Sequence, residues 1–414
     1  MKNKVIWYGI GKTVQSLFKS VYGLLDYIEY FVDERRAGEI FLDRKVVTPD
    51  IFRVSVTKPV VVSMVEERAD ERIIQLIHEY NLNSNQIWRA GEWIAYILSS
   101  DCEVNLMPEK VRLEACTICQ LNCPSCYMRI NNYGTAGKGY LRFDDFKKFV
   151  DENSFIKKIE LSNSGEVFLN PDLLNILKYG YEKGLEFTIS NGANFNFVSE
   201  DVLEGLVRYA VKRITVSIDG ASQRIYSMYR VNGNYDAVIS NIKKVIYFKH
   251  KYGTSYPELI WQYILMEHNE FEAGVAKRIA QDLGIKIFYK LDWEGRFEPK
   301  DPERLEKVTG FNIFNRKSWQ EHYGKKYTSD MCRQLLLAPQ INYDGRLLGC
   351  CGVYLNDWNV NVFKKGLKKN LNCGNYFSAL LDFMKGDYNQ QLDSICQDCS
   401  AKIHNAGERQ ILEF

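Results

Sequence analysis

Three cysteines within eight residues constrain this chain more than any other feature of its sequence. Cys119, Cys123 and Cys126 have the spacing C-x3-C-x2-C, and no fourth cysteine of matching spacing follows. A structural zinc site uses four protein ligands, often in two separated pairs, and a fully ligated [4Fe–4S] cluster also needs four. Three thiolates on such a cluster leave one iron open to a ligand from outside the protein. Zinc, or a structural cluster with a distant fourth ligand, is the alternative.

The composition is typical of a soluble globular protein, with 414 residues of which 46% are hydrophobic and 26% charged. This length allows two or three domains. The formal net charge of +2 gives no bulk attraction to nucleic acid or to an anionic membrane, so we expect neither as a partner. The run Val5–Tyr8 is too short for a signal peptide or a membrane span, which predicts a cytoplasmic protein. In that reducing compartment, eleven cysteines favour metal ligation over disulfides.

Residues 1–104 are expected to form a Rossmann-like α/β domain. Val5–Tyr8 is a short apolar strand, Gly9-Ile10-Gly11 follows it, and an amphipathic helix from Val14 to Leu24 leads to a second strand that ends at Asp33. Val14 stands where the dinucleotide-binding fingerprint has its third glycine. Nucleotide binding therefore stays open, because the two glycines can also serve only the tight turn. The segment resembles the small Rossmann-like domains fused to proteins of sugar and cell-surface glycan biosynthesis.

Residues 105–310 alternate strand and helix about six times, which predicts an α/β domain. The expected strands are 111–114, 158–162, 186–190, 213–218, 259–264 and 285–289. Repeated βα units imply a parallel sheet with its chemistry at the carboxyl ends of the strands, and the three-cysteine loop leaves the first of these ends. Glu160 and Gln262 lie within two strands and are polar residues that could satisfy each other inside the barrel.

Short polar motifs follow the expected strands in order. They are Asn163-Ser164-Gly165-Glu166, Ser190-Asn191-Gly192, Ser217-Ile218-Asp219-Gly220 and Tyr229-Arg230. With the three-cysteine loop, and the aromatic residue directly after it, these motifs resemble those of the radical S-adenosylmethionine (SAM) enzyme family. That family has a partial (β/α)6 TIM-like barrel, in which the three cysteines hold a [4Fe–4S] cluster and the open iron chelates SAM. The match to its Gly-Gly-Glu-Pro motif is partial, because Ser164 and Val167 replace a glycine and the proline.

The resemblance also implies which residues bind SAM. Glu166 would accept hydrogen bonds from the SAM ammonium, and Gly165 would let the backbone approach the ligand. Ser217 would contact the ribose or carboxylate, and Arg230 would pair with the carboxylate as a fork donor. The whole implied set is Tyr127, Ser164, Gly165, Glu166, Asn191, Ser217 and Arg230.

Residues 311–414 carry a second set of cysteines. Four of them, Cys332, Cys350, Cys396 and Cys399, suit either a zinc site or a fully ligated [4Fe–4S] cluster. Their arrangement resembles the twitch domain, the single-cluster relative of the SPASM domain found after radical SAM barrels, and so implies an auxiliary cluster. A hairpin over residues 339–345, turning at Asp344-Gly345, would carry the second ligand. Cys351 could replace Cys350. Cys373 is left over, and it is either a small hydrophobic residue or a hydrogen-atom donor to a substrate radical.

The resemblance implies an enzyme with two [4Fe–4S] clusters and SAM as cofactors. The reduced cluster would cleave SAM to methionine and a 5′-deoxyadenosyl radical, which abstracts a hydrogen atom from the substrate. We expect a dehydrogenase-like oxidoreductase that acts on a small polar molecule such as a sugar or aminocyclitol alcohol and passes an electron to the auxiliary cluster. A flavodoxin- or ferredoxin-type donor is the expected protein partner. A radical epimerase or a peptide-maturation enzyme is the alternative, and a zinc or iron–sulfur scaffold protein is the non-enzymatic one.

Overall fold

The protein is described from a computed structural model. The structure describes residues 3–11, 13–55, 57–63, 66–291, 297–310, 321, 333–350, 358 and 360–385. The chain divides into two compact units, the first from residues 1–109, 328–338 and 367–406, and the second from residues 110–327, 339–366 and 407–414. The described residues after 311 are thus shared between the units, whereas the sequence suggested a third, separate domain. The division into three domains stays a prediction.

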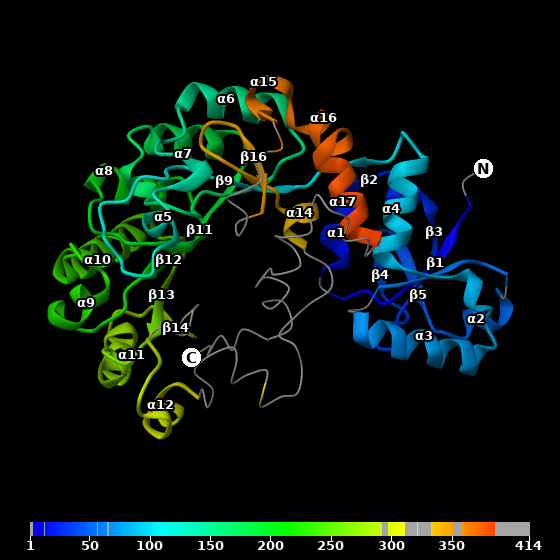
Figure 1. The fold of residues 1–414 in the computed structure, drawn as a ribbon, viewed down its shortest axis with the longest axis horizontal. Helices are drawn as coiled ribbons and strands as arrows, with labels where there is room; N and C mark the ends of the chain where they lie inside the picture. The colour runs from blue at the N-terminus through cyan, green and yellow to red at the C-terminus, as the bar shows by residue number, and fades with distance from the viewer. Residues whose placement is uncertain are drawn as a thin grey trace. The chain divides into compact units, whose positions relative to one another are not determined.

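The first unit is built on a sheet of order β4-β5-β3-β1-β6-β7, drawn in blue in Figure 1. The strands of this unit are β1 Val5–Tyr8, β2 Val21–Tyr22, β3 Ile28–Val32, β4 Ile40–Phe41, β5 Arg44–Val47, β6 Val60–Val62, β7 Ile87–Arg89 and β8 Asn105–Leu106. Strands β2 and β8 pair with each other in a separate small sheet. The helices of this unit are α1 Val14–Ser20, α2 Ile51–Val54, α3 Glu66–Tyr80, α4 Ala90–Ser100, α14 Arg333–Leu337, α16 Leu367–Asn372 and α17 Asn375–Lys385. All neighbours in the sheet pair in parallel except β4 and β5, which confirms the Rossmann-like expectation.

The glycine turn after β1 is closed by its own neighbours. The Asp33 carboxylate accepts hydrogen bonds from the backbone N–H of Ile10 at 3.3 Å and of Arg35 at 3.0 Å. The helix that follows ends at Ser20, because Val21 and Tyr22 are extended and pair with Asn105 and Leu106, so the predicted extension of this helix to Leu24 is wrong.

The segment 367–385 packs on the first unit. Asn372 on α16 accepts a hydrogen bond from the Leu106 N–H at 2.6 Å and donates one to the Leu106 carbonyl at 2.9 Å. Helix α17 lies against α4 so closely that a Cβ on Gly91 would come within 2.5 Å of the Met384 carbonyl oxygen. Only glycine allows this approach.

The second unit is a sheet of order β14-β13-β12-β11-β10-β9-β15-β16, in which β9 to β14 are parallel and follow one another in sequence (Figure 1). Its strands are β9 Lys110–Leu113, β10 Lys158–Glu160, β11 Glu186–Ala193, β12 Arg213–Ser217, β13 Glu258–Leu265, β14 Lys286–Leu291, β15 Gln340–Ile341 and β16 Leu347–Gly349. Its helices are α5 Tyr127–Ile130, α6 Phe143–Glu152, α7 Leu173–Glu182, α8 Glu200–Arg208, α9 Gln223–Tyr229, α10 Tyr235–Tyr252, α11 Ala273–Asp282, α12 Pro302–Thr309 and α15 Val362–Lys365. All six predicted barrel strands are present, with ends shifted by a few residues.

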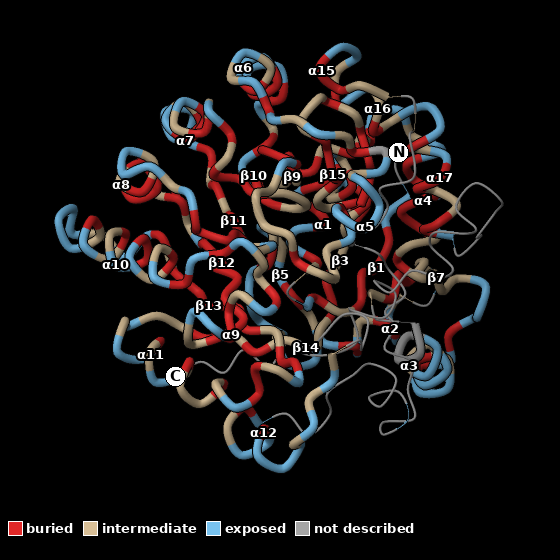
Figure 2. The backbone as a smooth tube through the Cα atoms, turned by 60° about the vertical axis from the view of Figure 1, so that its left-hand side comes forward, coloured by how far each residue is buried: buried red, intermediate tan, exposed pale blue. Residues whose placement is uncertain are grey.

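Helices cover the outside of this barrel-like sheet. Figure 2 shows buried residues along the strands and exposed residues on the outer turns of α6, α7, α8 and α10. Helix α10 begins where the Asn234 side chain accepts a hydrogen bond from the Ala237 N–H, and it ends at Gly253, whose φ is 59°. The predicted hairpin is also confirmed: β15 pairs in parallel with β9 and antiparallel with β16, and Gly345 turns the chain with a φ of 86°.

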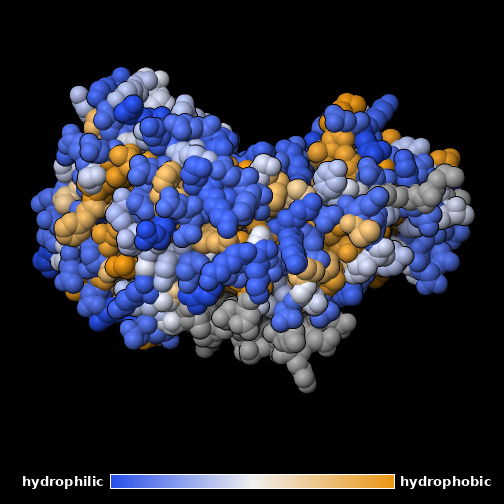
Figure 3. All heavy atoms as spheres, turned by 90° about the horizontal axis from the view of Figure 1, so that it is seen from above, coloured by the Kyte–Doolittle hydropathy of each residue, from blue (hydrophilic) through white to orange (hydrophobic). Residues whose placement is uncertain are grey.

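The face of the molecule shown in Figure 3 is mostly hydrophilic, with hydrophobic residues gathered in small separate patches. Among the described residues, no helix has both the length and the apolar character needed to cross a membrane.

Candidate cofactor and metal site

The three cysteines lie on the loop that leaves the carboxyl end of β9 and runs into α5. Cys123 is buried, and Cys119 and Cys126 are half-buried. Backbone hydrogen bonds to two other segments hold this loop in place. The Asn122 N–H donates to the Val231 carbonyl at 2.9 Å, and the Glu166 N–H donates to the Ile118 carbonyl at 2.8 Å. The described cysteines form no disulfide.

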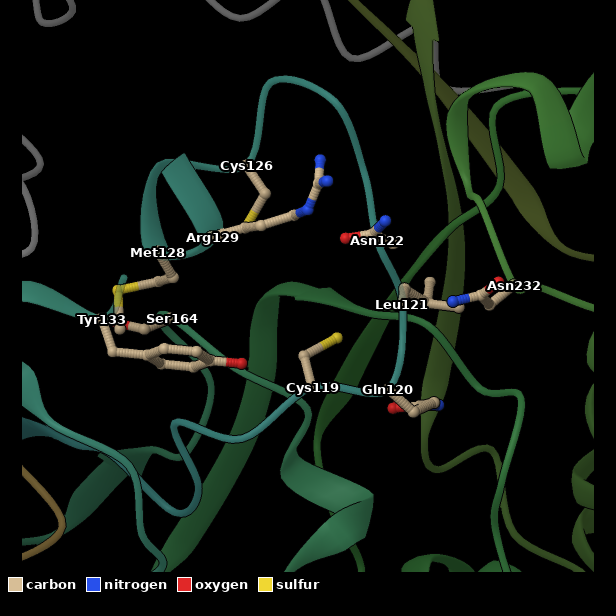
Figure 4. A pocket seen from close by; sticks show the side chains of 10 residues that line it. All are labelled: Cys119, Gln120, Leu121, Asn122, Cys126, Met128, Arg129, Tyr133, Ser164 and Asn232. Carbon is tan, nitrogen blue, oxygen red and sulfur yellow. The ribbon is translucent and has the colours of Figure 1, made fainter. Parts of the chain in front are cut away.

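A pocket of about 260 Å³ opens beside this loop. Its lining residues, drawn in Figure 4, are Cys119, Gln120, Leu121, Asn122, Cys126, Met128, Arg129, Tyr133, Ser164 and Asn232. Figure 4 shows the Tyr133 hydroxyl directed toward the Cys119 sulfur, with Cys126 on the other side of the space. The pocket therefore has thiols and polar groups on its walls, as a site for a metal cluster and a polar ligand requires.

Burial disfavours the charged form of two of the three loop cysteines. Burial raises the pKa of the Cys119 thiol to about 12, and it also raises the pKa of Cys123. A metal cluster would supply positive charge that stabilises thiolates at such buried positions. In the described part of the chain, no three Cys, His, Asp or Glu side chains converge in metal-binding geometry. The donor chemistry fits an iron–sulfur cluster, and the three thiols are neighbours on one loop without converging on a common point.

The predicted SAM-binding loop 163–166 packs directly on the cysteine loop. A Cβ on Gly165 would lie 2.4 Å from the Cys116 carbonyl oxygen, so only glycine fits there. Glu166 is 1% exposed. Its carboxylate accepts hydrogen bonds from the N–H of Asn194 at 2.7 Å and of Phe168 at 3.4 Å, and burial raises its pKa to about 7. Glu166 thus links its own loop to the segment that follows β11. Its contact with SAM stays a prediction.

The residues predicted after the next two strands lie close to this loop. The exposed Asn191 side chain donates to the Asn163 carbonyl at 2.9 Å. Ser217 is buried, and its hydroxyl accepts a hydrogen bond from Gln262 Nε2 at 3.3 Å. A Cβ on Gly192, which has a φ of 116°, would lie 2.5 Å from the Ser217 hydroxyl, so these motifs are in contact.

Glu160 and Gln262, which the sequence left as two polar residues that could satisfy each other, bond to other partners. Glu160 accepts hydrogen bonds from the Ser162 and Thr188 hydroxyls, both at 2.6 Å, and from the Ser190 N–H at 2.8 Å. It therefore links the ends of β10 and β11.

Arg230 is held beside Cys123 by a buried acid. Its Nε donates to the Asp219 carboxylate at 2.6 Å, and its Nη1 lies 3.7 Å from the Cys123 sulfur. Asp219 is fully buried, and its other oxygen accepts the Ile264 N–H at 2.7 Å. Burial lowers the pKa of Arg230, but the negative charge of Asp219 outweighs this and keeps the pKa well above its usual value. The predicted contact of Arg230 with the SAM carboxylate is not tested.

Two residues of this site carry no motif and were missed in the sequence. Glu114, directly after β9, is buried and accepts the Ser164 N–H at 3.0 Å, and burial raises its pKa to about 7. Asn194, directly after β11, is 4% exposed and contacts Cys119, Gln120 and Glu166. Their position just past barrel strands was the one available signal.

The remaining predicted site residues are less informative. Tyr127 is the first residue of α5 and is 41% exposed. Cys350 is buried directly after β16, while Cys332, Cys351, Cys396 and Cys399 lie outside the described residues. Cys373 lies in the first unit between α16 and α17, is exposed, and has its sulfur 3.0 Å from the Lys369 carbonyl oxygen. The auxiliary-cluster set and the hydrogen-donor role of Cys373 stay predictions.

No protein-family model matches the chain. A curated relative, the "AdoMet-dependent heme synthase" of Methanosarcina barkeri (strain Fusaro / DSM 804), is 30% identical over 138 residues, which are 33% of this chain and 38% of that protein. The chain thus matches well under half the length of this relative.

Solved structures share the fold. A crystal structure of Streptococcus suis SuiB bound to precursor peptide SuiA matches with a TM-score of 0.51 and 13% identity, over 76% of this chain and 71% of that one. Another SuiB crystal structure matches with a TM-score of 0.50 and 13% identity, over 77% and 78%. These likenesses confirm the fold expected from the sequence, in which the cysteine loop follows the first barrel strand, and the radical SAM family itself stays a proposal.

Proposed function

We propose that this chain is a radical SAM enzyme, with a [4Fe–4S] cluster on Cys119, Cys123 and Cys126 and SAM beside it. The observation that carries the proposal is the loop of three thiols next to a pocket of about 260 Å³ at the carboxyl end of the barrel strands. The name of the curated relative, which is AdoMet-dependent, supports the same cofactor. When bound, the reduced cluster and SAM supply a carbon radical that removes a hydrogen atom from an unactivated C–H bond.

The chain's own residues position and shield this chemistry. The Arg230 guanidinium places a positive charge 3.7 Å from the Cys123 sulfur, which stabilises a thiolate there. Asp219 and the Ile264 backbone keep that guanidinium in place. Gly165 packs on the Cys116 carbonyl with no room for a side chain, and the polar walls of the pocket suit the amino and carboxylate groups of SAM.

For the reaction, we propose oxidation of an alcohol on a small polar substrate such as a sugar or aminocyclitol. Oxidising CH–OH to C=O removes one hydrogen atom, one proton and one electron, so a second electron acceptor is needed. An auxiliary [4Fe–4S] cluster on Cys332, Cys350, Cys396 and Cys399 would accept that electron. Support comes from the β15–β16 hairpin, which ends directly before Cys350 as a twitch domain requires.

Peptide modification is the second candidate. It is favoured by the matching SuiB structure, which contains a precursor peptide. The two candidates are separated by offering the loaded enzyme either polyols or short peptides together with SAM, and measuring which one is altered in proportion to 5′-deoxyadenosine formed.

The test of the proposed function is anaerobic reconstitution followed by SAM cleavage with dithionite. We expect about eight irons per chain, as two four-iron clusters require, and formation of methionine and 5′-deoxyadenosine. Cys123→Ala is expected to abolish cleavage. Cys102→Ala, which removes an exposed cysteine of the first unit, is the matched control and should behave as wild type. Two zincs and no cleavage would instead identify a metal-bound scaffold protein.

A further inference from the structure

Asn194 is a buried residue that contacts both the cysteine loop, at Cys119, and the proposed SAM-binding loop, at Glu166. It is the first residue after β11, and its side chain is 4% exposed. The side-chain nitrogen Nδ2 lies 3.6 Å from the Cys119 sulfur, within the range of an N–H···S hydrogen bond. Its backbone N–H donates to the Glu166 carboxylate at 2.7 Å. One residue thus connects a proposed cluster ligand with a proposed SAM ligand.

The orientation of the Asn194 amide is fixed by its neighbours. The backbone N–H of Asn196 is a donor only, and it lies 3.0 Å from Asn194 Oδ1. Gln120 Nε2 lies 2.8 Å from the same oxygen. An amide turned the other way would place its NH₂ group against the Asn196 backbone N–H, so the nitrogen faces the Cys119 sulfur, and it also lies 3.4 Å from Gln120 Oε1.

We infer that Asn194 is a positioning residue that sets the reduction potential of the cluster by donating its amide N–H to the Cys119 thiolate. This inference rests on the proposed function, because it requires a cluster on Cys119. Reduction adds negative charge to a cluster, so a donor aimed at one of its sulfur ligands stabilises the reduced form more than the oxidised form. Burial keeps water from replacing that donor, which increases its electrostatic effect.

The side-chain donor can be removed without breaking the backbone contact. Asn194→Leu keeps the branched shape and the number of side-chain heavy atoms but has no side-chain N–H, and Asn194→Asp keeps the shape of the side chain but replaces the donor by an oxygen. In both variants the backbone N–H to Glu166 stays. Asn153→Leu is the matched control, because Asn153 is also a buried amide, 3% exposed, but its Nδ2 bonds to the Phe149 carbonyl at the end of α6.

The experiment is an anaerobic redox titration of reconstituted protein, followed by electron paramagnetic resonance (EPR) of the cluster signal that changes when SAM is added. We expect Asn194→Leu to shift the midpoint potential to a more negative value than wild type, and Asn194→Asp to shift it further in the same direction. The Asn153→Leu variant should keep the wild-type midpoint. A readout of potential is used because a purely structural role of Asn194 would leave it unchanged.

The failure of this inference differs from a failure of the proposed function. Wild-type protein that takes up no [4Fe–4S] cluster would contradict both. A wild-type cluster with the same midpoint potential in Asn194→Asp would overturn the inference alone, and this variant decides the question if Asn194→Leu does not fold.

Discussion

The loop after β1 and the loop after β9 occupy equivalent positions in two parallel sheets, yet they are held in different ways. The glycine turn after β1 is closed by the segment directly after β3, through Asp33 and the Val32 carbonyl. The cysteine loop after β9 is held instead from three other segments, through Glu166, Asn194 and Val231. The comparison indicates that the first loop is held mainly by the end of one neighbouring strand, β3, while the second depends on loops that follow several strands.

The largest expected difference between the two loops is in the stability lost when the acid beside each one, Asp219 or Asp33, is replaced by alanine. Asp219→Ala removes the fully buried partner of Arg230, and breaking such a pair typically costs about 3–5 kcal/mol of folding free energy. Asp33→Ala removes two partly exposed hydrogen bonds, for about 1 kcal/mol. Urea denaturation followed by pulsed hydrogen exchange and mass spectrometry measures the unfolding free energy of each unit separately. Equal losses in both variants would contradict the comparison.

The buried acid beside the cysteine loop should make stability depend on pH. Burial raises the pKa of Glu114 from 4.5 to about 7, so the folded protein binds more protons than the unfolded chain between these values. The contribution of Glu114 to stability is therefore complete below pH 4.5 and is lost as the pH rises toward 7, by at most about 1.4 kcal/mol per pH unit.

Replacing this carboxyl by an amide tests the sign of the effect. Glu114→Gln should flatten the pH profile of the urea midpoint of the second unit between pH 4.5 and 7. Glu103→Gln, at an exposed position of the first unit, is the control and should leave the profile unchanged. A steeper profile in Glu114→Gln would show that the carboxyl is charged in the folded protein.

The smallest expected effect separates the glycines of the two loops. Gly165→Ala places a methyl group 2.4 Å from the Cys116 carbonyl oxygen, and such overpacking costs about 1–3 kcal/mol. A Cβ on Gly11 has no neighbour within 4 Å, so Gly11→Ala should change stability by no more than about 0.5 kcal/mol. Thermal unfolding of the two variants, side by side, measures the difference. A costly Gly11→Ala would indicate a close approach at the glycine turn that the structure does not contain.

The barrel could be predicted from the sequence because its signals are local. Runs of β-branched and apolar residues mark all six strands, and polar motifs follow their ends in order. The contacts of Asn194 could not be predicted in this way, since a single asparagine after a strand resembles any turn residue, and its partner Cys119 lies 75 positions away. The same holds for Arg230 and Asp219, whose pairing beside Cys123 depends on how the loops fold together. The packing of α17 on α4 has no local signal either, because helix periodicity does not say which surface a helix covers.

The central claim is that three thiolates of one loop leave an iron open for SAM. The most direct measurement is the EPR spectrum of the dithionite-reduced, reconstituted protein before and after SAM is added. We predict a [4Fe–4S] signal whose g values change when SAM binds the open iron, and which is lost in Cys123→Ala. A cluster spectrum that SAM leaves unchanged would contradict the claim.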